Sequence, residues 1–328
     1  MSKKNVAVVC GGDSSEAEVS LRSAANVFEW VDKNLYTPYM VVMSRGDWSL
    51  QQDGKRIAAV DKNDFSAMVN GSKVKFDVAL IVIHGAPGEN GVLQSYFDIV
   101  RVPYTTCNAF VSALTFNKFA CKSFLSDQKI GMAKSALIRK GDKVNVDELV
   151  KFLGLPMFVK PNNGGSSFGV SKVKSAQDLQ RALNEAFKED SEVIVEEFIS
   201  GTELTCGAMI LSGKARVLPV TEVVSRNEFF DYGAKYSGQS DEITPARISA
   251  ELTAQVQAAT LDIYRRLGCN GIVRADYILS SSALYFLEIN TVPGMTAASF
   301  IPQQAAAAGL DMVRVLSEVI EDACSRKK

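Results

Sequence analysis

The sequence predicts a protein of mixed α/β and α+β class, in which an N-terminal parallel-sheet domain precedes two further domains. The first third alternates apolar, β-branched runs with helix-like stretches, as is typical of a parallel sheet flanked by helices. The middle third alternates strands and helices around a glycine-serine loop, and the last third contains hairpin-like strand pairs. Because 328 residues exceed one ordinary core, we expect domains at residues 1–107, 108–200 and 201–328.

The first domain begins with a strand, a glycine turn and a helix. Val6 to Cys10 is the strand, Gly11-Gly12 is the turn, and Ala17 to Val31 shows helical spacing. Apolar strands at Tyr39 to Met43 and Phe76 to Ile83 alternate with further helix-like stretches. Because such sheets bind ligands beyond the carboxyl ends of their strands, the loops that follow these strands are candidate site segments.

The second and third domains are expected to be α+β units. Helical patterns run from Asn108 to Gln128, and the helix at Ala250 to Leu267 is the longest in the last third. The remaining middle elements are expected at Lys134 to Ile138, Asn145 to Phe152, Met157 to Lys160, Gly169 to Val173, Ala176 to Lys188 and Val193 to Phe198. The last third adds strands at Leu204 to Leu211, Ala215 to Val220, Gly271 to Leu279 and Ala283 to Asn290, followed by two helices.

Composition excludes several classes of protein. Hydrophobic residues make up 47% and charged residues 22%, so the chain should fold throughout. The formal net charge is -1, which argues against a nucleic-acid partner. The six cysteines form no CxxC pair, which favours reduced thiols over a disulfide or zinc framework. With no signal-peptide pattern and no run of about 18 apolar residues, we expect a cytoplasmic protein without membrane contact.

A lysine precedes the flexible glycine-serine loop of the middle third. Lys160 ends a strand, and residues 161–169 read PNNGGSSFG. Such a loop can bring backbone N–H groups close to phosphate oxygens, while the lysine supplies a positive charge. No Gly-Lys-Ser/Thr opens the next helix, so a P-loop is disfavoured. The pattern predicts a triphosphate site, and a turn without ligand is the alternative.

Two neighbouring strands of the last third carry an arginine, two carboxylates and an amide. Arg274 and Asp276 alternate on one strand, and Glu288 and Asn290 alternate on the next. A hairpin would bring these four side chains together. Oxygen ligands of this kind suit magnesium bound to nucleotide phosphates. The alternative is an exposed polar face of a two-stranded ribbon.

Three loop segments are further candidates. His84, the only histidine, follows an apolar strand, where either a ligand contact or a structural role is expected. Glu16 follows the first strand and is a candidate site residue; alternatively, it stabilises a helix N-terminus. The polar, aromatic segment Phe229 to Tyr236 resembles a lid, in which Lys235 and Tyr236 could reach a phosphate and a substrate, or else an ordered surface loop.

Taken together, these segments resemble the D-alanine:D-alanine ligases of the ATP-grasp superfamily over nearly the whole chain. The resemblance implies a three-domain ATP-grasp architecture and an ADP-forming enzyme that joins two D-alanine molecules through a D-alanyl phosphate, for peptidoglycan precursors. Asn90 departs from the usual acidic residue of the family. The resemblance rests on GGDSSEAEVSL at 11–21, HGAPGENG at 84–91, KPNNGGSSFGV at 160–170, DYGAKY at 231–236, RAD at 274–276 and EINTVPGMT at 288–296.

The resemblance implies that ATP lies between the second and third domains. Lys118 and Lys160 would contact the phosphates, and Glu203 would bind the ribose. Two Mg²⁺ or Mn²⁺ ions would be held by Asp276, Glu288 and Asn290. The segment that holds adenine would consist of Glu196, Glu197, Phe198 and Ile199.

It also implies how the two amino acids are bound. Glu16 would hold the ammonium of the first D-alanine, with Ser166 and Tyr236 forming a hydrogen-bonded chain that pins the lid. Ser299 and Lys235 would meet the carboxylate of the second D-alanine, and Lys235 would also face the transferred phosphoryl group. The lid residue Tyr236 favours a dipeptide product over a D-alanyl-D-lactate ester.

Arg274 and the backbone N–H of Gly294 would stabilise the tetrahedral oxyanion, and His84 is a candidate for orienting the first substrate. A homodimer is the family expectation.

Three rival interpretations remain. The first is another ATP-grasp ligase with a different acid or amine, and the second is an ATP-binding sensor, which would not need the metal ligands. The third, a nicotinamide-dependent oxidoreductase, is suggested only by Gly11-Gly12, and the GxGxxG fingerprint is absent.

Overall fold

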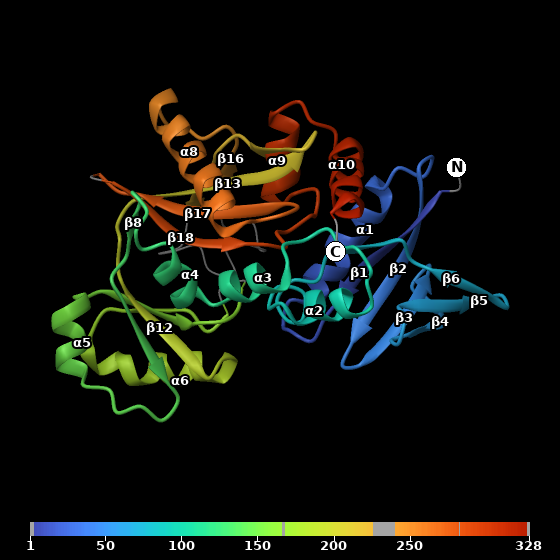
Figure 1. Ribbon diagram of the computed structural model, residues 1–328. Coiled ribbons are helices and arrows are strands. Elements are labelled where there is room, and N and C mark those ends of the chain that lie inside the picture. The colour runs from blue at the N-terminus through green and yellow to red at the C-terminus, as the bar shows by residue number, and fades with distance from the viewer. Residues whose placement is uncertain (1–2, 166–167, 226–239, 282, 327–328) are drawn as a thin grey trace.

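The computed structural model describes residues 3–165, 168–225, 240–281 and 283–326, and these residues form three sheets. Figure 1 shows the N-terminal sheet on the right, the C-terminal sheet at the upper left and the central sheet below it. The mixed α/β and α+β class expected from the sequence is confirmed. All six cysteines are free thiols, and five of them are buried.

The N-terminal sheet is mixed rather than wholly parallel. Its order is β6-β5-β4-β3-β2-β1-β7, and only β1 pairs in parallel, with β2 and β7. The prediction of helix-like stretches between residues 44 and 76 is wrong, because this region forms an antiparallel meander. The strands are β1 (Lys4–Gly11), β2 (Tyr36–Ser44), β3 (Asp47–Gln52), β4 (Lys55–Asp61), β5 (Ser66–Val69), β6 (Ser72–Lys75) and β7 (Val78–Ile81).

Two-residue turns explain the meander. Asp53-Gly54 joins β3 to β4, and Asn70-Gly71 joins β5 to β6, with positive φ at all four residues. Asp-Gly and Asn-Gly are the preferred pairs for tight hairpin turns, because both positions require a left-handed backbone. These dipeptides are the sequence signal that identifies the meander.

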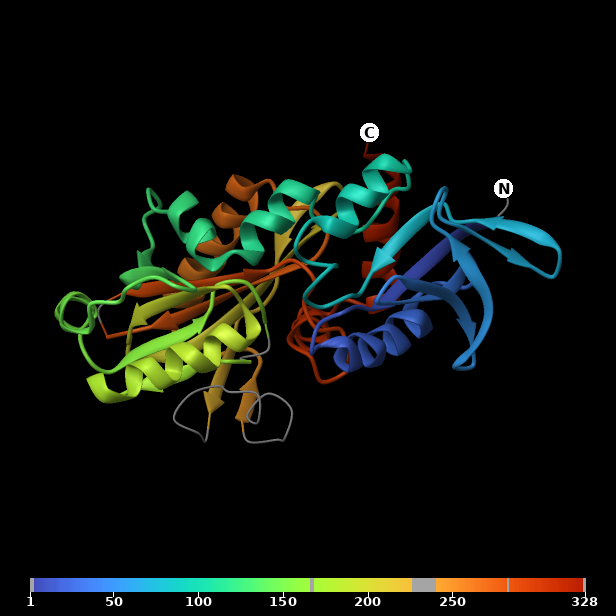
Figure 2. The same ribbon diagram turned by 90° about the horizontal axis from the view of Figure 1, so that it is seen from below.

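Helices cover both faces of the N-terminal sheet (Figure 2). Along β1, Val6, Val8 and Cys10 face α1 (Ala17–Trp30) and α10 (Met312–Ser325). Ala7 and Val9 face α2 (Val92–Ile99) on the opposite side. This alternation follows from the two-residue period of a strand. The C-terminal helix α10 is therefore part of the core of the N-terminal sheet.

The central sheet is antiparallel, with the order β11-β10-β12-β9. Leu149 and Leu183 are buried helix residues that pack on one face of it. Strand β10 ends beside the glycine-serine loop, which places Lys160 at the edge of this unit. The elements are β9 (Ser135–Arg139), α5 (Val146–Leu153), β10 (Met157–Pro161), β11 (Ser171–Val173), the 3₁₀ turn Ala176–Asp178, α6 (Leu179–Glu189) and β12 (Glu192–Glu197).

The C-terminal sheet has the order β16-β15-β13-β17-β18-β8, with β14 paired to β13. Helices α3 and α4 pack into its core through Val111, Cys121 and Leu125. Its strands are β8 (Gly131–Met132), β13 (Thr202–Leu211), β14 (Lys214–Val217), β15 (Thr221–Ser225), β16 (Ser240–Ile243), β17 (Val273–Leu279) and β18 (Leu284–Asn290). The helices are α3 (Ala109–Phe116), α4 (Lys118–Phe124), α8 (Ala250–Leu267), α9 (Phe300–Ala307) and α10.

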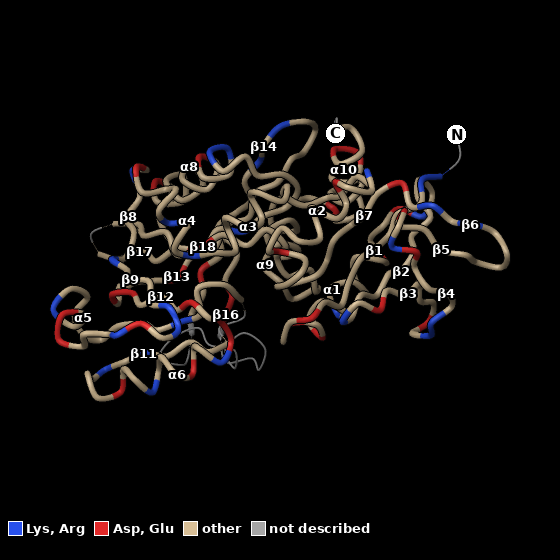
Figure 3. Tube along the Cα trace, turned by 60° about the horizontal axis from the view of Figure 1, so that its bottom comes forward, with Lys and Arg blue, Asp and Glu red and all other residues tan. Residues whose placement is uncertain are grey.

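Charged residues of both signs are interspersed along the chain (Figure 3), in agreement with the formal net charge of -1. Among the residues that the structure describes, no helix combines the length and the apolar character needed to cross a bilayer.

Candidate active site

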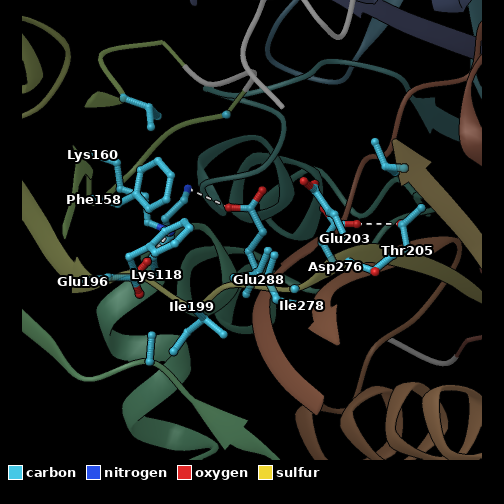
Figure 4. Close-up of a pocket in the computed structure, with 18 of the residues that line it drawn as sticks. Lys118, Phe158, Lys160, Glu196, Ile199, Glu203, Thr205, Asp276, Ile278 and Glu288 are labelled. Carbon is cyan, nitrogen blue, oxygen red and sulfur yellow. Dashed lines mark hydrogen bonds and ion pairs between the residues drawn. The ribbon is translucent and has the colours of Figure 1, made fainter. Parts of the chain in front are cut away.

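The main cavity has a volume of about 560 Å³ and lies between the central and C-terminal sheets. Its lining includes ten of the residues singled out from the sequence (some are labelled in Figure 4). These are Lys118, Lys160, Glu196, Glu197, Phe198, Ile199, Glu203, Arg274, Asp276 and Glu288. Segments more than 150 residues apart in the chain thus meet at one pocket.

One side of the cavity is lined by apolar side chains. The rings of Phe158 and Phe198 lie with their centroids 6.0 Å apart, and Lys172 Nζ lies 4.0 Å from the Phe198 centroid. Ile199 and Ile278 add aliphatic surface (Figure 4). Aromatic and aliphatic walls of this kind suit the flat base of a nucleotide. Phe158 was not predicted, although it alternates with Lys160 on β10 and so shares its face.

Two lysines project into the polar part of the cavity. Lys118 Nζ donates to the carbonyl of Gly164 at 2.5 Å and lies 3.4 Å from Glu288 Oε2. Lys160 Nζ lies 2.6 Å from Glu196 Oε2. The chain thus brings a lysine from α4 and a lysine from β10 to the glycine-serine loop.

Glu196 is the anion of a buried cluster. Its second oxygen accepts from Lys122, which the sequence argument missed. Burial alone would raise the pKa of Glu196, but the charges of Lys122 and Lys160 outweigh it and lower the pKa to about 2. Burial also opposes the charge of Lys160, yet Glu196 and Glu288 raise its pKa. Both groups are therefore ionised at neutral pH.

The hairpin expected from the sequence is present in β17 and β18. Arg274 is paired with Asn290, and Asp276 is paired with Glu288, so all four side chains share one face. Asp276 accepts from Asn290 Nδ2 at 3.1 Å and from Thr205 Oγ1 at 2.6 Å. Among the described residues, no group of three or more His, Cys, Asp or Glu side chains is arranged so that it could hold a metal ion. Two carboxylates and an amide, all oxygen donors, nevertheless fit a magnesium ion that is also bound by phosphates.

Arg274 forms a bidentate ion pair with Asp276. Its Nε and one terminal nitrogen lie 2.8 and 2.7 Å from the two carboxylate oxygens. Both side chains are largely buried. A guanidinium held by two parallel hydrogen bonds is fixed in direction as well as in position. Arg274 is thus a fixed positive charge beside the acidic residues.

Glu16 lies between two glycines from different parts of the chain. A Cβ atom on Gly85 would lie 2.9 Å from Glu16 Oε2, and a Cβ atom on Gly165 would lie 2.9 Å from Oε1. The absence of side chains at these two positions therefore makes room for the buried carboxylate. Gly165 belongs to the glycine-serine loop, so Glu16 faces the loop that follows Lys160.

His84 is buried, and both of its ring nitrogens are occupied. Nδ1 donates to the carbonyl of Val292 at 2.8 Å, which leaves Nε2 to accept from Ser23 Oγ at 3.0 Å. Burial lowers its pKa, and the charge of Arg274 acts in the same direction. The imidazole is therefore neutral, and these contacts hold the turn that follows β18.

Ser299 and Gly294 meet in the next turn. Ser299 Oγ accepts from the backbone N–H of Thr296 at 3.1 Å, and a Cβ atom on Gly294 would lie 2.9 Å from that oxygen. Ser299 also precedes the first turn of α9. Ser166, Lys235 and Tyr236, the remaining candidates, lie outside the described residues.

A nucleotide-sized cavity between two sheets, lined by both lysines and carboxylates, is characteristic of the ATP-grasp fold, to which the structural relatives belong. Two family descriptions match the chain: "D-ala D-ala ligase N-terminus" over residues 5–107 and "D-ala D-ala ligase C-terminus" over residues 124–321. The chain belongs to the D-alanine–D-alanine ligase family.

Curated relatives match over the full length. The D-alanine–D-alanine ligase of Phocaeicola vulgatus is 51% identical over 98% of this chain and 99% of its own length. That of Bacteroides fragilis ATCC 25285 is 52% identical over the same shares. Among solved structures, the VanG D-Ala:D-Ser ligase of Enterococcus faecalis has a TM-score of 0.88 at 33% identity, covering 98% of this chain and 100% of that one. The Bacillus anthracis D-alanine–D-alanine ligase complexed with ATP has a TM-score of 0.77 at 31% identity, covering 98% and 97%.

Proposed function

We propose that this protein joins two D-alanine molecules into D-alanyl-D-alanine at the expense of ATP, releasing ADP and phosphate, and so supplies a precursor of peptidoglycan. The observation that carries the proposal is the position of Glu16 against Gly165, which places an acidic side chain beside the loop that follows Lys160. An ammonium group bound at Glu16 would then lie next to a phosphate site. The relatives with about 50% identity support this substrate assignment.

ATP is expected to occupy the main cavity. Its adenine would lie against the wall that includes Phe158 and residues 196–199, and its ribose would reach Glu203. Lys118 and Lys160 would bind the phosphates, since each has its ammonium at the polar end of the cavity. Much of the catalytic effect in phosphoryl transfer comes from positioning and from neutralising charge, which two fixed lysines supply.

Two Mg²⁺ or Mn²⁺ ions would be held by Asp276, Glu288 and Asn290. Bound there, divalent cations neutralise the phosphate oxygens and so allow a carboxylate to approach them. The hydrogen bonds that Asp276 receives from Thr205 and Arg274 orient its carboxylate at the cavity. Orientation of a metal ligand by such partners strengthens the site.

The first D-alanine would be bound through its ammonium by Glu16. Its carboxylate attacks the terminal phosphorus of ATP, the bond to ADP breaks, and a D-alanyl phosphate forms. Ser166 and Tyr236 would pin the lid above it, and His84 would orient it through the turn that the imidazole holds. Exclusion of water by the lid would protect the acyl phosphate from hydrolysis.

The second D-alanine would be held at its carboxylate by Ser299 and Lys235, with Lys235 also facing the transferred phosphoryl group. Its amine attacks the acyl carbon, loses a proton, and phosphate leaves. Arg274 and the backbone N–H of Gly294 would stabilise the oxyanion of this step, an effect often worth about 3 kcal/mol per donor. The fixed orientation of Arg274 favours this role, because it requires no reorganisation during the reaction.

We also propose the setting in which the enzyme works. Residues 1–107, 108–200 and 201–328 would be its three domains, two chains would form a homodimer, and the compartment would be the cytoplasm. The separate core of the central sheet supports the second domain. Helices α3 and α4, which belong to the second of these domains, pack in the core of the C-terminal sheet, so the second and third domains would be in contact there.

The test is product analysis with purified protein. ADP release and the ligated product are measured with D-alanine, L-alanine, D-serine and D-lactate near pH 7, with and without magnesium. We expect D-alanyl-D-alanine from D-alanine, little product from L-alanine, and no turnover without a divalent cation. D-serine is included because VanG is a D-Ala:D-Ser ligase. A higher turnover with D-serine or D-lactate as second substrate would contradict the proposed product.

A further inference from the structure

Lys122 is a buried lysine that the active site described above leaves without a role. It lies in α4 one helical turn after Lys118, and its side chain is only 5% exposed. The cavity lining described above includes Lys118 and does not include Lys122. Because lysines are almost never buried without a partner, its position requires a specific interaction.

That interaction is with Glu196, at the floor of the cavity. Lys122 Nζ donates to Oε1 of Glu196, and Lys160 Nζ lies 2.6 Å from Oε2. The carboxylate therefore receives one lysine on each oxygen, and it is itself only 6% exposed. One of these lysines faces the cavity and the other lies behind it (Lys160 and Glu196 are labelled in Figure 4).

The charges of this cluster depend on Lys122. Because each oxygen of Glu196 is taken by a different lysine, Glu196 compensates the charge of Lys160 only in part, and Lys160 stays available to an incoming phosphate. Without Lys122, the second oxygen of Glu196 could also turn toward Lys160, and Glu196 would then compensate the charge of Lys160 more fully. In a water-poor site, one unit of charge has a far larger effect on an anionic ligand than it has in bulk water.

The same contacts also fix the orientation of the Glu196 carboxylate. A carboxylate that is held on one oxygen by Lys122 cannot turn both oxygens toward Lys160. Lys160 is thus restricted to a single contact with Glu196, and its other donor positions remain directed elsewhere. Spacing of four residues on α4 lets one helix place Lys118 and Lys122 on the same side.

We propose that Lys122 is a positioning residue of the nucleotide site, which holds Glu196 and thereby keeps the charge of Lys160 available to the phosphates of ATP. This inference rests on the proposed use of the cavity for ATP. Lys122 acts only through Glu196, without touching the nucleotide.

The test is a double-mutant cycle on the full chain. ADP binding is measured by calorimetry in wild type, Lys122→Met, Glu196→Gln and the double variant. We expect Lys122→Met to weaken ADP binding at least about tenfold, which corresponds to about 1.4 kcal/mol. In the Glu196→Gln background, the same substitution should change binding by less than about threefold, because the charge that Lys122 balances is gone. Lys129→Met, at an exposed lysine after α4, is the matched control.

A loss of the same size in both backgrounds would show that Lys122 only supports packing and would overturn the proposal, as would unchanged ADP binding in Lys122→Met. Circular dichroism verifies folding. If Lys122→Met does not fold, Lys122→Gln retains a donor toward Glu196 and enters the same cycle. The cycle measures only ADP binding and does not depend on dipeptide synthesis. A protein that binds ADP but makes no D-alanyl-D-alanine would therefore contradict the proposed function, while the double-mutant cycle would still test the role of Lys122.

Discussion

Glu89 connects the N-terminal and C-terminal parts of the chain through a single buried carboxylate. Its two oxygens accept from the backbone N–H groups of Gly85, at 2.8 Å, and Val292, at 3.0 Å. His84 binds the carbonyl of the same Val292. Both backbone groups of Val292 are therefore held by the loop after β7, and this fixes the turn between Asn290 and Gly294.

A pH-dependent stability follows from the pKa of Glu89. Burial, followed by the charge of Glu16, raises this pKa from 4.5 to about 7. The folded state therefore holds the proton more tightly than the unfolded state. The resulting stabilisation is fully present below about pH 4.5 and is lost as the pH rises through about 7. Relative to Glu89→Gln, the unfolding free energy of the wild type should fall by up to about 3 kcal/mol between pH 5 and pH 8.

Urea denaturation at several pH values measures this difference. Glu89→Gln also loses one acceptor, which lowers stability by a similar amount at each pH, so the slope with pH is the informative quantity. Glu18→Gln, at an exposed position of α1, is the control and should follow the wild type. If the unfolding free energies of the wild type and Glu89→Gln changed in parallel with pH, the raised pKa assigned to Glu89 would be contradicted.

Several residues that line the cavity were expected from the sequence, but Phe158 in the cavity wall and the residues behind the wall were missed. Lys160 could be predicted because it stands beside the glycine-serine loop, whereas Lys118 was implied only by the resemblance to the D-alanine:D-alanine ligases. Lys122 and Glu89 acquire their roles from partners 74 and 203 residues away, which no local pattern reveals. The only signals were the four-residue spacing from Lys118 and the place of Glu89 in the loop after an apolar strand.

At the level of elements, the loop between β10 and β11 is fitted to the N-terminal domain. Gly165 is not among the glycines with a positive φ, so its backbone does not exclude alanine, but the added Cβ would lie 2.9 Å from Glu16 Oε1. Gly165→Ala should therefore displace the carboxylate and raise the KM for D-alanine about tenfold, since small displacements at an active site have large effects on rate. ADP binding should change less than about twofold, because the three atoms nearest to the added Cβ all belong to Glu16 and none to Lys118 or Lys160.

Steady-state kinetics with D-alanine and calorimetry with ADP separate the two effects. A variant in which ADP binding weakens as much as D-alanine binding would show that the whole loop has moved. An unchanged KM for D-alanine would contradict the assignment of Glu16 as the ammonium site.

The elements that the sequence predicted well have clear local signals. Helix α8 begins and ends as expected, at Ala250 and Leu267, because Ser249 caps its N-terminus and Gly268 ends it in a left-handed conformation. Strands β3 to β6 were missed because they are only four to seven residues long and several of their apolar residues are exposed or half-buried. For that region, the turn dipeptides carry more information than the periodicity does.

At the scale of the whole molecule, the first and last segments share one core. Val8 and Val27 from the N-terminal sheet and its helix pack in the same cluster as Val315 and Leu316 from α10. No sequence pattern indicated this contact, because amphipathic helices show which face is buried and not what covers it. The two ends of the chain should therefore unfold together.

Leu316→Ala tests this coupling. Leu316 is 1% exposed, so its truncation should cost about 2 to 5 kcal/mol. Both tryptophans, Trp30 and Trp48, lie in the N-terminal part, so their fluorescence reports the unfolding of that part alone. We expect the fluorescence transition in urea to shift to lower concentration, although the substitution lies almost 270 residues away. Leu183→Ala, which is equally buried in the separate core of the central sheet, should shift it less. A fluorescence transition that stays in place while the far-ultraviolet circular dichroism of Leu316→Ala moves would show that the two ends unfold independently.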